Sequence, residues 1–328
     1  MCGISGYINY ENDLQESFST LKEMCKTLEK RGPDEEGFFF SKHAALGHKR
    51  LSIVDIENGK QPMRFKIFGT EYVIVYNGQL YNTKELKDVL TKNGFIITTH
   101  SDTEILLKSY IHYGEHVCKY LNGIFGFAIW NSKSEELFIA RDQFGIKPLY
   151  YSKFEGNFIF ASEIKSILSF PRINPILDKT GIKELFGIGP AHSPGCTPFK
   201  GIFELEPAHY IIVNKNGMYK KEYWHIQTKP HEDDFETTCE KINFLIKDSV
   251  ERQLVSDVPL CTLLSGGLDS SIITAIAANY YKNEFGEKLN TFSVDYVDQE
   301  KNFVKNDFQP DLDDKYIDLM VNTFRNQS

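Results

Sequence analysis

The second residue of the chain is a cysteine, and it belongs to the string MCGISGYI. Two interpretations are open from this string alone. Chain ends often fray and carry no function, so Cys2 can stand there by chance. Alternatively, removal of Met1 leaves Cys2 with a thiol and a free α-amine, which together are a nucleophile and its own base. The second interpretation predicts covalent catalysis, and the rest of the chain must decide between the two.

The string SGGLDSS at residues 265–271 has residue types that suit the binding of an anion. The apolar run VPLCTLL before it predicts a central strand, and SIITAIAANYY after it predicts a helix. A glycine-rich turn at a helix start directs backbone N–H groups and the positive end of the helix dipole at a phosphate. The string lacks the G-K-[ST] ending of the common phosphate-binding loop. A tight strand–helix connection without a ligand is the alternative.

The elements before residue 170 alternate between short apolar segments and turns. Residues 3–10 predict a buried strand, and the apolar spacing in FSTLKEMCKTLEKRG predicts a helix with Cys25 in its core face. EYVIVYNGQLYN predicts two strands around an Asn-Gly turn. SDTEILLKSYIHYG predicts a helix capped by Ser101 or Asp102, and residues 123–164 predict four more strands. We therefore expect layered sheets with helices packed outside them.

The length of 328 residues suggests two domains. Prolines interrupt residues 171–230, and a new helix is expected after KPHEDDFE, ending near 255. We place the boundary near 230, which gives domains of residues 2–229 and 230–328. The helical pattern of DDKYIDLMVNTFRNQS closes the chain.

Composition limits the class of protein. The net charge of −8, from 37 basic and 45 acidic side chains, argues against a nucleic-acid partner bound through phosphates. The six cysteines form no C-x-x-C pair, so reduced thiols in the cytosol are expected rather than disulfides or a zinc site. We expect no membrane span and no signal peptide, because the first residues lack a basic region.

Seven short motifs occur together in a fixed order, and together they resemble glutamine-dependent asparagine synthetase. They are Cys2-Gly3-Ile4, RGPD at 31–34, GHKRLSIVD at 47–55, YNGQLYN at 76–82, SDTE at 101–104, RDQFGIKPLYY at 141–151 and SGGLDSS at 265–271. The resemblance implies an αββα N-terminal-nucleophile glutaminase domain of mixed α and β structure. An α/β parallel-sheet ATP-pyrophosphatase (PP-loop) domain would follow it.

The resemblance also implies roles in the first domain. Cys2, freed of Met1, would attack the side-chain amide of L-glutamine, with its α-amine as base. Asn77 and the N–H of Gly78 would form the oxyanion hole. Arg50 would bind the substrate carboxylate, and Asp102 would bind its ammonium group. The remaining pocket residues would be Leu51, Ser52, Ile53, Val54 and Gln79.

Each of these residues also has an ordinary structural interpretation. Arg50 could be a surface cation, Asn77-Gly78 a hairpin turn and Asp102 a helix cap. Their joint occurrence behind an N-terminal cysteine favours the functional interpretation. His48 is expected to be a structural neighbour rather than a catalyst.

In the second domain, the resemblance implies that ATP binds near the phosphate loop and the strand TFSVDY. The implied residues are Leu264, Ser265, Gly266, Gly267, Asp269, Ser270 and Val294, with Asp269 also helping to hold Mg²⁺. The implied reaction joins L-aspartate and ATP to give β-aspartyl-AMP and pyrophosphate, and ammonia then displaces AMP. The resemblance is compatible with a homodimer.

The sequence departs from the family at two positions and in length. Gln79 stands where the family has glutamate, and Lys30 stands where histidine precedes RGPD. Only 64 residues follow the start of SGGLDSS, room for about two strand–helix–strand units of roughly 30 residues each. We therefore expect an incomplete synthetase domain and doubtful synthetase activity.

Three alternatives remain open from the sequence. The chain could belong to a related amidotransferase that amidates another carboxylate. It could be a glutaminase alone or an inactive remnant that binds partners. It could also come from the β-lactam-forming branch of this architecture, against which the intact Cys2 argues.

Overall fold

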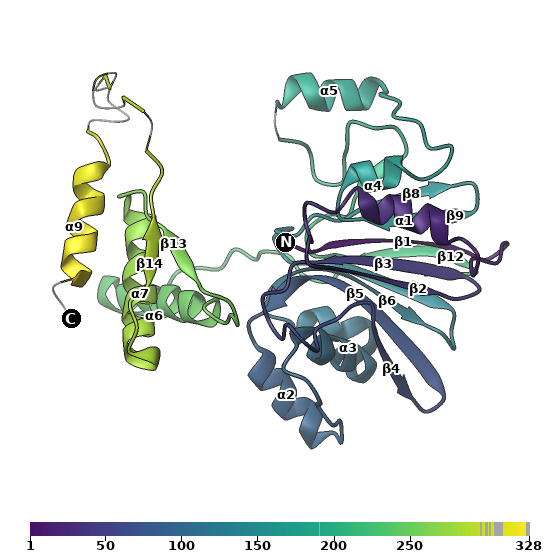
Figure 1. The fold of residues 1–328 in the computed structure, drawn as a ribbon, viewed down its shortest axis with the longest axis horizontal. Helices are drawn as coiled ribbons and strands as arrows, with labels where there is room; N and C mark the ends of the chain where they lie inside the picture. The colour runs from purple at the N-terminus through teal and green to yellow at the C-terminus, as the bar shows by residue number, and fades with distance from the viewer. Residues whose placement is uncertain (190, 296, 299–300, 302, 305–310, 326–328) are drawn as a thin grey trace. The chain divides into compact units, whose positions relative to one another are not determined.

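The computed structural model describes residues 1–325 except 190, 296, 299–300, 302 and 305–310 (Figure 1). The chain divides into two compact units, and the division falls between Thr228 and Lys229. Each unit has its own sheet structure, so the two are described separately.

The N-terminal unit contains two six-stranded antiparallel sheets. The strands of the first sheet, in spatial order, are β10 (Ile202–Glu204), β8 (Tyr150–Phe154), β9 (Asn157–Ala161), β1 (Gly3–Asn9), β3 (Ala44–Arg50) and β2 (Glu35–Phe40). Those of the second sheet are β12 (Gly217–Glu222), β11 (His209–Asn214), β7 (Glu136–Arg141), β6 (Gly123–Asn131), β5 (Thr70–Leu80) and β4 (Met63–Ile67). The stretch that is rich in proline thus supplies β10, β11 and β12, which the sequence pattern did not predict.

Helices cover the outer face of each sheet, as expected (Figure 1). The helices on the first sheet are α1 (Phe18–Lys26) and α4 (Ile164–Leu168). Those on the second sheet are α2 (Thr83–Lys92), α3 (Asp102–Tyr113) and the 3₁₀ helix η1 (Gly114–Lys119). A further helix, α5 (Lys179–Gly187), precedes β10. The result is an αββα arrangement of layers.

Alternating apolar side chains hold these layers together. Ile4, Ile8, Val73, Val75 and Trp130 lie in the core between the two sheets. Residues of opposite parity on the same strands, such as Tyr7 and Ile74, face the outer helices, because side chains alternate across a strand. Both faces of the sheets are therefore buried, and full burial of each large apolar side chain contributes roughly 1.5–3 kcal/mol.

The predicted turn at Asn77-Gly78 is wrong, because β5 runs through both residues without interruption. Asn77 pairs with Gly126 and Gly78 pairs with Phe125 on β6. A two-residue Asn-Gly hairpin needs positive φ at both residues, and neither residue has it. Gly78 is needed for another reason: a Cβ there would lie 2.3 Å from the carbonyl oxygen of Ile124. The glycine permits close approach of two backbones.

The C-terminal unit alternates helices with short strands. They are α6 (Phe235–Arg252), β13 (Cys261–Leu263), α7 (Leu268–Phe285), β14 (Asn290–Phe292) and α9 (Asp314–Arg325). The expected strand–helix–strand order is present, and β13 and β14 are parallel. Among the described residues, however, β13 pairs with β14 alone, so the predicted central position of this strand is not observed there.

Candidate active site

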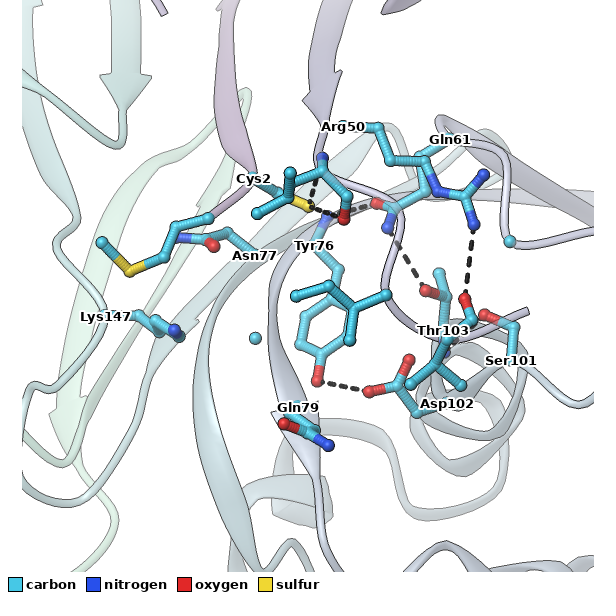
Figure 2. A pocket seen from close by; sticks show the side chains of 16 residues that line it. Cys2, Arg50, Gln61, Tyr76, Asn77, Gln79, Ser101, Asp102, Thr103 and Lys147 are labelled. Atoms are coloured by element: carbon cyan, nitrogen blue, oxygen red, sulfur yellow. Dashed lines mark hydrogen bonds between the residues drawn. The ribbon is translucent and has the colours of Figure 1, made fainter. Parts of the chain in front are cut away.

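A pocket in the N-terminal unit brings together the residues just before β1, the end of β3 and the loop after it, β5 and the start of α3 (Figure 2). Pairing of β1 with β3 sets Gly3 opposite Lys49, so Cys2 lies beside the end of β3. Of the residues expected to bind glutamine, all except Ser52 line the pocket: Cys2, Arg50, Leu51, Ile53, Val54, Asn77, Gly78, Gln79 and Asp102. The backbone N–H of Ser52 instead donates to Asp34, 2.7 Å away.

The Cys2 thiol lies against the backbone of Leu51. The Leu51 N–H donates to Sγ over 3.4 Å, and Sγ lies 3.7 Å from the Leu51 carbonyl oxygen. Burial raises the pKa of this thiol, while the Leu51 N–H bond opposes the rise. The Cys2 carbonyl oxygen accepts a 2.9 Å bond from Arg31, which also pairs with Glu163. The Leu51 N–H therefore holds the thiol, and Arg31 holds the backbone that carries it.

The Asn77 side chain is the second notable group in the pocket. It is 1% exposed, and its Nδ2 has no hydrogen-bond partner in the part of the chain that the structure describes. A buried amide without a partner costs roughly 1–3 kcal/mol, so such a group indicates a place for a ligand atom. Figure 2 shows the Asn77 amide on the same side of the pocket as Cys2 and Lys147.

Arg50 is deeply buried and organises the loop that follows β3. Its guanidinium donates to Glu35 over 2.8 Å and to the carbonyl oxygens of Val54, Asp55 and Ile56 over 3.3, 2.7 and 2.8 Å. The interpretation of Arg50 as a surface cation is therefore wrong. The guanidinium shapes the loop whose residues line the pocket.

Asp102 begins α3, and its carboxylate turns toward the pocket. Ser101 is the helix cap, since its side chain accepts a bond from the Thr103 N–H. Asp102 Oδ2 accepts bonds from the Tyr76 hydroxyl at 2.9 Å and the Leu80 N–H at 3.1 Å. Burial raises the pKa of Asp102, and these two bonds oppose the rise. The two bonds thus offset part of the cost of burying the Asp102 carboxylate, and a cation beside it would favour its ionised form.

Several pocket residues were not singled out from the sequence, among them Gln61, Tyr76 and Lys147. Gln61 accepts a 2.6 Å bond from the Tyr76 N–H and donates to Thr103, 3.2 Å away, so it joins β5 to α3. Lys147 lines the pocket near Cys2, and burial lowers its pKa. Lys147 belongs to the motif RDQFGIKPLYY and Tyr76 to the motif YNGQLYN, whereas Gln61 belongs to none of the quoted motifs.

His48 has the structural role that the sequence suggested. It is fully buried, and its Nε2 lies 3.0 Å from the carbonyl oxygen of Tyr76. A carbonyl only accepts, so Nε2 must carry the proton. Burial lowers the pKa of His48 to about 4, so the ring is neutral at pH 7.

The string SGGLDSS covers the end of the turn after β13 and the first four residues of α7. The Ser265 and Ser270 hydroxyls lie 3.1 Å apart, and Gly266 has a φ of +81° that favours glycine. Leu264 is buried and pairs with Phe292, while Val294 lies beyond the end of β14 and is 79% exposed. Gly267 caps α7, and Asp269 lies in its first turn. The turn is open toward solvent.

The described residues include neither a membrane-spanning helix nor a cluster of metal-binding side chains. The helices in these ranges are too short or too polar to cross a membrane. The described ranges also contain no cluster of three or more His, Cys, Asp or Glu side chains that could hold a metal ion.

Solved structures show the fold. The glutamine phosphoribosylpyrophosphate amidotransferase of Bacillus subtilis, solved with ADP and GMP, superposes with a TM-score of 0.51 at 18% identity. The match covers 92% of this chain and 71% of that one. The αββα layers of the N-terminal unit therefore have the same fold as the corresponding part of that amidotransferase.

Curated relatives and family models are more specific than the fold. The chain is 46% identical to asparagine synthetase [glutamine-hydrolyzing] 3 of Bacillus subtilis over 99% of this chain and 53% of that protein. It is 36% identical to asparagine synthetase [glutamine-hydrolyzing] 1 of the same organism over 91% and 46%. The chain thus spans about half the length of these relatives. Residues 241–324 match the asparagine synthase family model. Residues 1–224 match the glutamine amidotransferase domain, and the chain belongs to that family.

Proposed function

We propose that the N-terminal unit hydrolyses L-glutamine to glutamate and ammonia, with Cys2 as nucleophile after removal of Met1. The observation that supports this most is the buried Nδ2 of Asn77, which has no hydrogen-bond partner among the described residues and belongs to a residue that lines the same pocket as Cys2. A neutral N–H donor beside a nucleophile is what a developing oxyanion requires.

The mechanism assigns a role to each end of the pocket. The α-amine of the mature Cys2 takes the thiol proton, and Sγ attacks the carboxamide carbon of glutamine. The Asn77 Nδ2–H and the Gly78 N–H stabilise the resulting oxyanion. Ammonia leaves with the proton held by the α-amine. Water then hydrolyses the thioester and releases glutamate.

Recognition of the amino-acid end uses the opposite side of the pocket. Asp102 binds the α-ammonium group, and Arg50 attracts the α-carboxylate as the buried cation of that side. Leu51, Ile53, Val54 and Gln79 line the same pocket and complete the binding site for the chain of the substrate. A glutamine here would place its amide toward Cys2 and Asn77.

For the C-terminal unit we propose a part in the ATP-dependent amidation of L-aspartate. The match of residues 241–324 to the asparagine synthase family supports it. ATP would bind along Leu264, Ser265, Gly266, Gly267, Asp269, Ser270 and Val294. Asp269 offers one carboxylate, which fits Mg²⁺ bound mainly through nucleotide phosphates. The metal would neutralise charge on those phosphates.

The whole protein would therefore be a glutamine-hydrolysing asparagine synthase, a carbon–nitrogen ligase that takes its amide nitrogen from glutamine. Six free cysteines support a reducing, cytoplasmic location. Amidation of a different carboxylate is the alternative, and the acceptor requirement would distinguish the two.

Mass spectrometry combined with a glutaminase assay tests the proposal. We expect the active protein to lack Met1 and to release ammonia from glutamine. A variant with one residue inserted between Met1 and Cys2 should fold equally well and release none, because it lacks a free amine on Cys2. Glutamine hydrolysis by protein that retains Met1 would refute the mechanism.

A further inference from the structure

Asp55 lies in the loop after β3, close to the pocket but not on its lining. It is 6% exposed, and its φ of +49° is a conformation that Asp and Asn adopt more readily than most residues. Its carbonyl oxygen accepts bonds from Arg50 at 2.7 Å and from the Gly59 N–H at 2.8 Å. The residue therefore closes the loop around the Arg50 guanidinium.

The carboxylate of Asp55 joins this loop to a second segment. Oδ1 accepts from the Asn58 N–H at 3.1 Å and from its side-chain amide at 3.0 Å. Oδ2 accepts from the His100 N–H at 2.8 Å. Burial opposes ionisation, but the bonds from His100 and Asn58 hold the pKa of Asp55 below its usual range. Oδ1 therefore binds within the loop after β3, and Oδ2 binds the segment that contains His100.

The segment around His100 is itself rigidly held. Glu104 accepts bonds from the backbone and side chains of Thr98 and Thr99, and it pairs with the buried Lys108. Asp102 follows His100 by two residues. A bond at His100 therefore fixes the carboxylate that faces the pocket relative to the loop formed around Arg50.

We propose that Asp55 is a positioning residue that fixes the carboxylate-binding and ammonium-binding ends of the glutamine site relative to each other. This inference rests on the proposed glutaminase function. Asp55 itself does not contact substrate. Its loss would let the Arg50 loop and the Asp102 segment move independently, so glutamine would have to order them upon binding.

Asp55→Asn is the sharpest test. Asparagine tolerates the same positive φ, but its NH₂ group must face an N–H donor, either that of His100 or those of Asn58. We expect the KM for glutamine to rise about tenfold while kcat stays within about twofold, because binding is lost equally in ground and transition states. Glu57→Gln changes an exposed carboxylate of the same loop and should leave both constants unchanged.

A second substrate separates positioning from general damage. Glutaramate is glutamine without its α-amino group, so it does not use Asp102. Asp55→Asn should therefore raise the KM for glutaramate much less than the KM for glutamine. Equal increases for both substrates, or an unchanged KM for glutamine, would overturn the inference. Asn58→Ala removes the bond from the Asn58 side-chain amide to Asp55 and should raise the KM for glutamine by a smaller factor. This variant keeps the inference testable if Asp55→Asn folds poorly.

Hydrogen exchange gives a readout that does not depend on catalysis. In the 328-residue protein, the His100 amide should exchange faster in Asp55→Asn than in the wild type. If the wild type hydrolyses neither substrate, the proposed function fails, and exchange alone then decides the role of Asp55. Unchanged protection at His100 would show that Asp55 does not hold the two segments together.

Discussion

The Tyr76 hydroxyl donates a 2.9 Å hydrogen bond to Asp102 and so links strand β5 to the first turn of α3. Both groups are buried, and burial raises the pKa of each. Donation from Tyr76 favours the ionised form of Asp102, and the Leu80 N–H acts in the same sense. The bond keeps a buried carboxylate available for a cationic substrate group.

Tyr76→Phe should shift the pH dependence of glutamine hydrolysis. In the proposed site, Asp102 must be ionised to bind the α-ammonium group, so activity should fall as pH decreases through its pKa. Loss of the Tyr76 bond raises that pKa further, and the acid limb of kcat/KM should move to higher pH. Initial rates between pH 5 and 8 measure the shift. An acid limb that stays in place would mean that another group controls it.

Asn77→Ala should lower kcat about 10²–10³-fold and change KM little, because its bond forms mainly with the oxyanion. Steady-state kinetics with glutamine give both constants. Asn93→Ala, at the exposed C-terminal end of α2, serves as a control and should behave as the wild type. An effect of Asn77→Ala on KM alone would assign this amide to ground-state binding.

Substitutions of Cys2 and Cys25 should differ in their effects. Cys2→Ala should abolish glutamine hydrolysis without lowering the free energy of unfolding. Cys25 is fully buried, its Sγ lies 3.2 Å from the Ser5 hydroxyl, and burial raises its pKa to about 11. Cys25→Ala should therefore keep activity and lower stability by about 1–2 kcal/mol. Denaturant titration and ammonia release distinguish the two variants. If Cys25→Ala abolished hydrolysis and Cys2→Ala only lowered stability, Cys2 would not be the nucleophile.

The layered fold followed from residues whose local pattern is strong. The apolar stretch of β1, the helical spacing in α1 and the cap at Ser101 all identified elements that the structure contains. Strand β10 was missed because it has only three residues, and β11 and β12 were missed because they follow a stretch that is rich in proline. The Asn77-Gly78 pair was misassigned because local turn preference ignores the pairing with β6.

Only part of the site could be predicted from the sequence, for a similar reason. Motif residues such as Arg50 and Asp102 could be named, and both line the pocket. Gln61 and Asp55 act through partners far away in the chain, 42 and 45 residues for Thr103 and His100. No periodicity encodes such contacts, so they emerged only from the folded structure.

The 328-residue chain should hydrolyse glutamine but release little pyrophosphate from ATP, with either glutamine or ammonium as nitrogen donor. Within the described residues the C-terminal sheet has two short strands, and Val294 is largely exposed beside them. Attack of aspartate on the α-phosphate needs an aspartate pocket and more charge neutralisation around the leaving group than SGGLDSS supplies.

Ammonium bypasses Cys2, so pyrophosphate release with ATP, aspartate and ammonium tests the C-terminal unit alone. Glutamine hydrolysis by the same sample controls for correct folding of the N-terminal unit. Strong release that depends on aspartate would show that residues 229–328 already contain the acceptor site.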